Sequence, residues 1–224
     1  SGYVRVKKGP FTLLIDVAPL GPDYIPAHAH ADSLSYEFSL NEQRIVVNSG
    51  TSHYHSGKAR DYERGTSAHS TVEIDSENSS EVWHSFRVAR RAKVDEVMID
   101  VNKHTITVSA KHDGYLRFKN KCMHSRKWII GETSLEIIDE IQGSFGSAVS
   151  RHFLCPTNLL SVERIHDRKV EFGGLSIESE THDVFDVATQ WFPEFGRPIP
   201  NSCLEMRMHS NEAQPRFHLK FFNP

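Results

Sequence analysis

The stretch His104-Thr-Ile-Thr-Val-Ser109 places an apolar β-branched residue at every second position. Because successive side chains of a strand point to opposite faces, this alternation predicts a strand with one buried face. Similar stretches recur along the chain, separated by Gly, Asn, Asp and Pro: Thr12–Asp16, Arg44–Val47, Ser134–Asp139, Ala148–Leu154 and Cys203–His209. We therefore predict an all-β chain of about a dozen strands, without an amphipathic helix, in stacked antiparallel sheets that form a sandwich-like fold.

The composition is that of one ordinary globular domain, which we place at residues 1–224. The formal net charge of −3 excludes the global positive field that nucleic-acid binders use. No apolar run approaches the roughly 20 residues needed to span a membrane. The cysteines are Cys122, Cys155 and Cys203, an odd number without a CxxC pair, so they indicate neither a disulfide framework nor a compartment.

Histidine is unusually frequent, with 14 residues in the chain. The segment Pro26-Ala-His28-Ala-His30-Ala-Asp32 alternates small and polar residues. In an extended segment, His28, His30 and Asp32 would share one face, as a divalent metal or an acid–base site requires. The alternative is a surface strand whose histidines are solvated.

Other polar positions follow in the next part of the chain. Val46-Val47-Asn48-Ser49-Gly50-Thr51 is a strand end with a polar residue, and it also suits an ordinary turn. The irregular, polar segment Thr51–Arg60 predicts a long loop, where functional residues often lie. His69 is expected to begin a strand and to face the same way as Thr71 and Glu73; alone, it also fits a structural role.

The run "DVAPLG…PAHAHADSLSYEFSLNEQRIVVNSGT…RDYERGTSAHSTVEID" resembles the signature of the heparinase II/III-like family. That signature combines an HAHAD-type motif, a "VDPGT"-like strand end and an "AHNTV"-like segment, in this order. The resemblance covers residues 13 to 90, with weaker similarity at His124–Lys127 and Arg151–Leu154. It implies the β domain that follows an (α/α) toroid in polysaccharide lyases, with the helical domain absent from this chain.

The resemblance also implies roles for individual residues. His28 would line the active site as a catalytic residue, and Tyr62 is a second candidate there. Zinc would be the cofactor, with His30, the residue at position 48 and His69 as ligands. Arg60 and Arg64 are candidates for binding the substrate, because local guanidinium groups suit an anionic polysaccharide.

Two positions depart from the family pattern. Asn48 stands where the family has Asp, and Ser49 stands where it has Pro. A neutral amide oxygen is a poorer zinc ligand than a carboxylate, so zinc binding requires charge from elsewhere, for example from Asp32 or Glu73. If residues 34–40 and 44–48 form a simple hairpin, the segment that contains His30 must also curl off the sheet to approach Asn48.

The implied function is β-elimination at a uronic acid of a polysaccharide such as a glycosaminoglycan. The missing helical domain would supply the other half of the active site, so we expect the isolated chain to be inactive. The compartment stays open, although the family tends to be periplasmic or secreted. The main alternative is a non-catalytic carbohydrate-binding β module with a degenerate metal site. A cupin-like metalloenzyme is disfavoured because Glu37 lies seven residues after His30. A purely structural sandwich leaves the HAHAD alternation unexplained.

Overall fold

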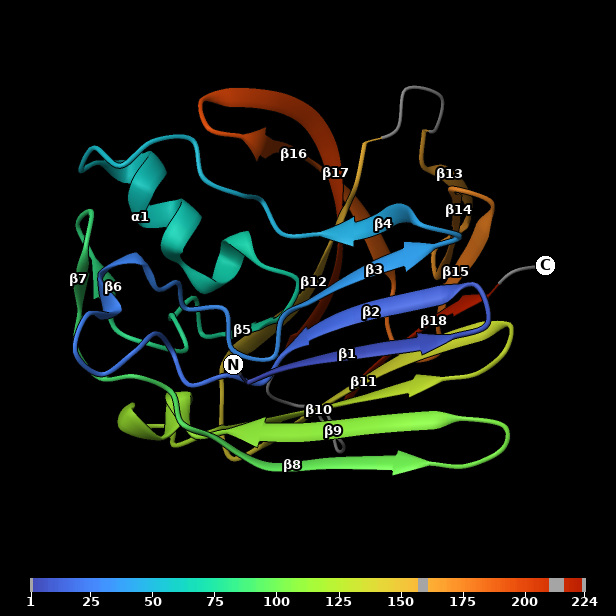
Figure 1. Ribbon diagram of the computed structural model, residues 1–224, viewed down its shortest axis with the longest axis horizontal. Helices are drawn as coiled ribbons and strands as arrows, with labels where there is room; N and C mark the ends of the chain where they lie inside the picture. The colour runs from blue at the N-terminus through green and yellow to red at the C-terminus, as the bar shows by residue number, and fades with distance from the viewer. Residues whose placement is uncertain (1, 157–160, 210–215, 223–224) are drawn as a thin grey trace.

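The computed structural model describes residues 2–156, 161–209 and 216–222, and two stacked antiparallel sheets dominate them (Figure 1). The first sheet has the order β1-β2-β3-β4-β12-β17-β16, with β5 paired to β12. Its strands are β1 (Tyr3–Lys8), β2 (Phe11–Asp16), β3 (Tyr36–Leu40), β4 (Gln43–Val47), β5 (Val72–Ile74), β12 (Ser147–Leu154), β16 (Val184–Glu194) and β17 (Arg197–His209). The predicted fold class is confirmed.

The second sheet has the order β13-β14-β15-β18-β11-β10-β9-β8. Its strands are β8 (Val94–Val101), β9 (Ile106–His112), β10 (Met123–Ile130), β11 (Ser134–Gln142), β13 (Glu163–His166), β14 (Lys169–Phe172), β15 (Leu175–Ser179) and β18 (Arg216–Phe222). A separate small ribbon pairs β6 (Val82–Trp83) with β7 (Arg87–Val88). Neighbouring strands within each of these sheets pair in antiparallel register, and alternate residues of each strand point to opposite faces of its sheet.

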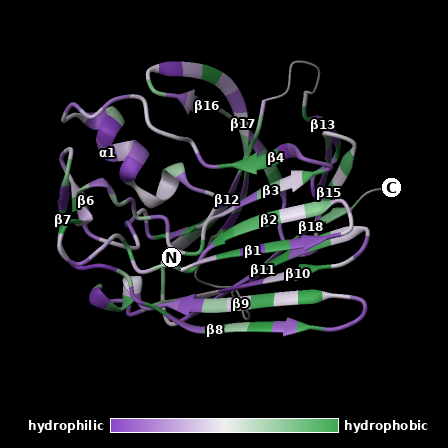
Figure 2. Cartoon of the chain, in the orientation of Figure 1, coloured by the Kyte–Doolittle hydropathy of each residue, from purple (hydrophilic) through white to green (hydrophobic). Residues whose placement is uncertain are grey.

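The core lies between the two sheets because each sheet turns its alternate apolar residues inward. In β2, the side chains of Phe11, Leu13 and Ile15 are fully buried. Phe38 of β3 packs against Phe221 of β18, with ring centroids 5.5 Å apart. Figure 2 shows apolar residues along the strands and polar residues at the end that holds α1. Burial of this apolar face stabilises the stack.

The helical elements gather at one end of the sheets. They are the α-helix α1 (Lys58–Arg64) and the 3-10 helices η1 (Pro26–His28), η2 (Thr66–Ala68) and η3 (Gly114–Arg117). The chain was expected to lack an amphipathic helix and to form a loop over Thr51–Arg60, whereas α1 begins at Lys58. This helix buries Arg60, Glu63 and Arg64 rather than apolar residues. It therefore has no 3.6-residue hydrophobic period from which a helix could be predicted. No helix in the described parts of the chain is long and apolar enough to cross a membrane.

The hairpin predicted between residues 34–40 and 44–48 is present as β3 and β4, with Asn41 and Glu42 in the left-handed region at its turn. The HAHAD segment leaves the sheet, as the hairpin geometry required. Its first part is η1 rather than extended backbone, so His28, His30 and Asp32 do not share one strand face. The loop directs each of these side chains to a different environment.

Candidate functional site

His30 and His69 come together at the α1 end, although 39 residues separate them in the chain. His30 Nδ1 lies 3.2 Å from His69 Nε2. Burial lowers the pKa of His69 to about 4. Burial, together with His69, the guanidinium groups of Arg60 and Arg64, and His28, lowers the pKa of His30 to about 2. Both rings are therefore neutral at pH 7, and one can donate a hydrogen bond to the other.

Arg60 extends this pair on its other side. Its Nη1 lies 3.4 Å from His30 Nε2 and 3.5 Å from Thr51 Oγ1, and its Nε donates to the Ser85 carbonyl at 3.4 Å. The Tyr54 ring covers the guanidinium, 5.2 Å from ring centroid to Cζ. The Arg60 side chain is fully buried, yet its Nη2 has no hydrogen-bond partner among the described residues. A buried N–H without an acceptor is costly, so this atom marks a place for a ligand acceptor or a water molecule.

Arg64 has a different environment from Arg60. Its Nε and Nη2 donate to the Ala29 carbonyl at 3.2 and 3.0 Å. Its Nη1 lies within hydrogen-bond distance of the carbonyls of Trp83, His84 and Arg87. Arg64 thus ties the HAHAD loop to the β6–β7 ribbon. Its role in binding substrate stays a prediction, and the contacts describe a side chain already occupied by backbone.

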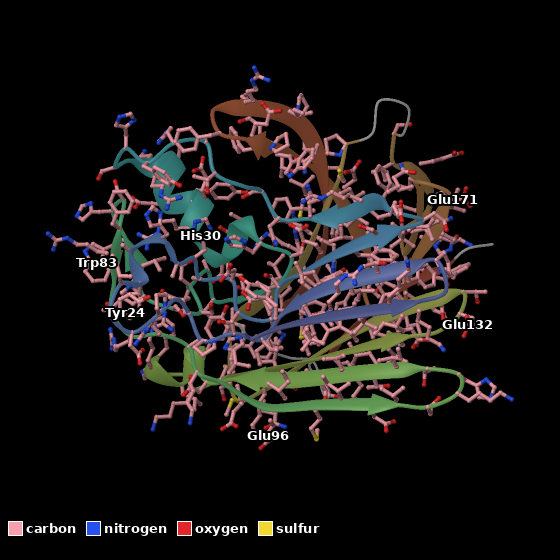
Figure 3. All side chains as sticks on the ribbon, viewed as in Figure 1. Tyr24, His30, Trp83, Glu96, Glu132 and Glu171 are labelled. Carbon is pink, nitrogen blue, oxygen red and sulfur yellow. The ribbon has the colours of Figure 1, made fainter. Side chains whose placement is uncertain are left out.

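His28 is the exposed histidine of this corner. Its ring meets the rings of Tyr54 and Phe86 edge-on, with centroids 5.2 and 5.3 Å apart. Tyr54 also contacts Phe86 and Phe195, at 5.7 and 5.0 Å between centroids. Figure 3 shows His30 at the same end of the molecule as Tyr24 and Trp83, away from Glu132 and Glu171. The exposed imidazole of His28 therefore sits beside a group of partly exposed aromatic rings. No sequence pattern indicated Tyr54, Phe86 and Phe195, because aromatic residues in loops have no period that singles them out.

Tyr62 lies on α1, in surroundings that differ from those of the histidine pair. It lines a groove with residues of β16, and burial raises the pKa of its phenol to about 12. The group therefore keeps its proton at neutral pH and can donate a hydrogen bond. Its catalytic role stays a prediction.

Asn48 contributes little to a metal site in this arrangement. Its Oδ1 accepts a hydrogen bond from the Ser70 amide at 2.9 Å. It lines a cavity of about 230 Å³ that it shares with Asp16 and Asp32, whereas neither His30 nor His69 lines that cavity. The amide therefore holds the segment next to His69 in place.

Asp32 and Glu73, the possible replacements for a carboxylate at position 48, do not supply the negative charge that a zinc site would need. Burial and the neighbouring Asp16 raise the pKa of Asp32 to about 8, which keeps Asp32 largely protonated at pH 7. Glu73 pairs with Arg151 at 2.9 Å. Among the residues that the structure covers, no three His, Cys, Asp or Glu side chains form a metal-binding group. Two facing imidazoles beside a guanidinium do not by themselves fit Zn²⁺, which favours a closed set of N, S or carboxylate ligands.

A buried ionic network holds the site segments from behind. Arg126 of β10 binds Asp139 of β11 through two hydrogen bonds, of 2.6 and 2.9 Å. The Nη1 of Arg126 donates to the carbonyls of Leu34 and Ser70, at 3.0 and 2.6 Å. Ser70 adjoins His69, and Leu34 ends the loop that carries His30. The network thus links the second sheet to both segments that supply the paired histidines.

Histidines extend this network through the core. His124 Nε2 lies 2.7 Å from Asp139 Oδ1, and His112 Nε2 lies 3.1 Å from His124 Nδ1. On the side of the first sheet, His152 connects Ser150 to the hydroxyl of Tyr36. Burial lowers the pKa of His152 to about 3 and that of His112 well below its ordinary value. These rings are neutral structural elements, and they account for part of the high histidine count.

A model described as "Heparinase II/III-like, C-terminal" matches residues 1–219. The chain belongs to this family. The family resemblance inferred from the motifs is thereby confirmed, and the fold described above is that of its C-terminal domain.

Solved structures agree with the assignment at the level of fold. The heparan sulfate lyase HepC from Pedobacter heparinus superposes with a TM-score of 0.77 at 14% identity, over 99% of this chain and 35% of that one. A structure named heparinase III gives a TM-score of 0.73 at 16% identity, over 99% of this chain and 35% of the other. The chain thus spans about a third of the length of these lyases. No curated protein matches the sequence.

Proposed function

We propose that this chain is the C-terminal part of a polysaccharide lyase that cleaves a uronic-acid-containing polysaccharide by β-elimination. The observation that carries the proposal is the corner where exposed His28 stands beside Arg60 and the His30–His69 pair, in a chain of the heparinase II/III-like family. The similar structures named above include a heparan sulfate lyase, which suggests a glycosaminoglycan as substrate.

The reaction needs a group to stabilise the C6 carboxylate, a base for the C5 proton and an acid for the leaving oxygen at C4. In the proposal, the C5–H bond breaks and its proton passes to a base. The C4–C5 double bond forms, and the C4–O bond breaks as the oxygen takes a proton. His28 is the proposed proton carrier, because its imidazole is exposed on the surface of the corner.

Arg60 is the proposed partner of the carboxylate. Its Nη2, which has no hydrogen-bond partner in the described part of the chain, offers a charged donor in a buried setting, where a charge-assisted hydrogen bond is strong. Tyr54 covers the guanidinium, so direct contact with substrate requires the loop of residues 51–57 to move. The neutral His30–His69 pair orients Arg60 from the inner side.

An activity assay of the full-length protein tests this function. We expect it to generate ultraviolet-absorbing unsaturated uronate from heparan, alginate or hyaluronan, and we expect the isolated 224-residue chain to generate none. Tight binding of such polymers without unsaturated product would instead support the alternative, a carbohydrate-binding module. The exposed rings of Tyr54, Phe86 and Phe195 favour that alternative, because aromatic faces also suit sugar binding. If the protein neither bound these polymers nor formed unsaturated product, both the lyase proposal and the carbohydrate-binding alternative would be rejected.

Zinc binding through His30, Asn48 and His69 stays a prediction that these residues fit poorly, because Asn48 Oδ1 already accepts a hydrogen bond from the Ser70 amide. We expect dialysed protein to retain less than one zinc ion per chain, because two imidazoles and an amide oxygen form a weak site. Asn48→Asp should raise the bound zinc, measured by elemental analysis, whereas Asn41→Asp at the distant β3–β4 turn should not. Stoichiometric zinc in the unaltered protein would contradict the expectation.

A further inference from the structure

Strand β8 is the last strand of the second sheet, and no strand of the described residues lies on its outer side (Figure 1). Its exposed side chains are largely apolar: Val97 is 43% exposed, Met98 61%, Ile99 54% and Val101 67%. Edge strands of soluble proteins are usually short or carry Lys, Arg or Pro, because an open apolar edge pairs readily with other strands. The composition of β8 is therefore unusual for an edge that stays in water.

The other edges of the two sheets have those protective features. The edge strand β1 holds Arg5 and Lys7, and the edge strand β16 contains Pro193. The edge strand β13 spans only four residues, Glu163–His166. Strand β8 has eight residues and contains neither a basic residue nor a proline. The contrast singles out β8 as the edge that is suited to a partner.

The apolar residues of β8 continue the core face of the second sheet. Ile99 pairs with Val108 of β9, and Val101 pairs with Ile106, so the two members of each pair point to the same face. Val108 is fully buried between the sheets, whereas Ile99 is more than half exposed. The first sheet therefore does not cover β8, and a neighbouring strand would remove part of this apolar surface from water.

The backbone of β8 directs hydrogen-bonding groups along the same edge. The Asn102 amide donates to the Thr105 carbonyl at 3.0 Å, so these residues form a hydrogen-bonded pair at the β8–β9 turn. Such pairs alternate with non-bonded pairs in an antiparallel ladder, so Asp100 also bonds to β9. By the same alternation, the amides and carbonyls of Ile99 and Val101 point away from β9. A helix uses its own backbone groups internally, so only another extended strand matches this row.

The charges on β8 favour an antiparallel copy of the same strand. The beginning of β8 holds Asp95, and the turn after its other end holds Lys103. A two-fold axis at Ile99 brings each Asp95 toward the partner's Lys103 and places the two Ile99 side chains next to each other. An axis at Asp100 would instead place two carboxylates opposite each other, and a parallel pair would bring like ends together.

We propose that β8 is a dimerisation edge, at which two copies of this chain pair their β8 strands in antiparallel register about a two-fold axis at Ile99. The pairing joins the two second sheets into one continuous sheet, and the same strand serves both copies. In Figure 1, β8 lies at the lower edge of the molecule and α1 at its upper left. The interface is therefore separate from the histidine corner and does not depend on the proposed function.

Sedimentation velocity of the full-length protein over a range of concentrations tests the proposal. We expect a monomer–dimer equilibrium. Ile99→Lys should weaken the dimer at least about tenfold, because it sets two ammonium groups opposite each other at the axis. Ile165→Lys is the matched control, since Ile165 is 47% exposed on β13, at the far edge of the same sheet. This control should dimerise like the unaltered protein.

Charge reversal keeps the test valid if Ile99→Lys fails to fold. Lys103→Glu should weaken the dimer, because it brings a second negative charge toward the partner's Asp95. Adding Asp95→Lys to Lys103→Glu should restore the dimer, since opposite charges then meet again across the interface. Both positions are exposed, so neither change should alter the fold.

Cross-linking of Ile99→Cys tests the position of the axis. The natural cysteines of the chain, Cys122, Cys155 and Cys203, are all buried. A short bis-maleimide should therefore join two copies of the Ile99→Cys variant into a covalent dimer. The Ile165→Cys variant and the unaltered protein should stay uncross-linked under the same conditions.

A full-length protein that stays monomeric at every concentration would overturn the proposal. So would a dimer that Ile99→Lys leaves intact, an equal effect of Ile165→Lys, or a failure of Ile99→Cys to cross-link. A monomer whose Ile99→Cys thiol does not react with maleimide would show that another part of the full-length protein covers β8. Lyase activity of a monomeric protein would leave the proposed function intact.

Discussion

Arg126→Met is expected to lower the free energy of unfolding by about 3–5 kcal/mol, the usual cost of removing one partner from a buried ion pair. Arg126 and Asp139 are both about 1% exposed, and the remaining carboxylate would lose two charge-assisted hydrogen bonds. The Leu34 and Ser70 carbonyls would also lose their donor. Urea denaturation followed by circular dichroism measures the change.

Arg44→Met is the matched control for this prediction. Arg44 pairs with Glu37 at 2.8 Å, but both side chains are substantially exposed, so the loss should be below about 1 kcal/mol. Adding Asp139→Leu to Arg126→Met should restore part of the stability, because it removes the uncompensated charge. A cost for Arg126→Met no larger than that of Arg44→Met would show that the network does not hold the two sheets together.

His28→Ala is expected to reduce kcat/KM of the full-length protein by about 100- to 10,000-fold, the range for loss of a general acid or base. The ring is exposed and makes only edge-on contacts with Tyr54 and Phe86, so its removal should leave the unfolding free energy nearly unchanged. The measurement is the initial rate of unsaturated-uronate formation over a range of substrate concentrations.

His55→Ala provides the comparison for His28→Ala. His55 is an exposed histidine of the neighbouring loop, and its ring contacts His53 rather than the proposed site. This variant should keep the activity of the unaltered protein. Unchanged kcat/KM in His28→Ala, or an equal loss in His55→Ala, would remove His28 from the proposed mechanism while leaving the family assignment intact.

Much of the fold could be predicted from local pattern. The alternation in residues 104–109 is present in β9, where Val108 is buried, because a strand buries alternate side chains whatever its partners are. The turn at Asn41 and Glu42 could also be predicted from the sequence, since it separates two stretches of alternating apolar and polar residues. Helix α1 was missed because its buried face consists of charged side chains, Arg60, Glu63 and Arg64.

The candidate site, too, could be predicted from the sequence only in part. The motifs around His28, His30 and His69 indicated the family, and the folded chain brings His30 within 3.2 Å of His69, whereas a shared role of the three histidines stays a prediction. The sequence did not predict that Arg60 and Arg64 would have different environments. The two residues are only one helical turn apart, so a similar environment was the natural expectation. Which atoms a guanidinium meets depends on loops from residues 29 and 83–87, which reach α1 only in the folded chain.

The sequence by itself therefore determined the period-2 strands, the stacked-sheet class and the ordered motifs that identify the family, because each depends on residues close together in the chain. Only the tertiary structure decided that Asn48 binds the Ser70 amide, that Arg60 and Glu63 each keep a buried polar atom without a partner among the described residues, and that Arg126 ties the two sheets together. The physical reason is that burial and hydrogen-bond partners arise from segments far apart in the chain, and no local pattern encodes that packing.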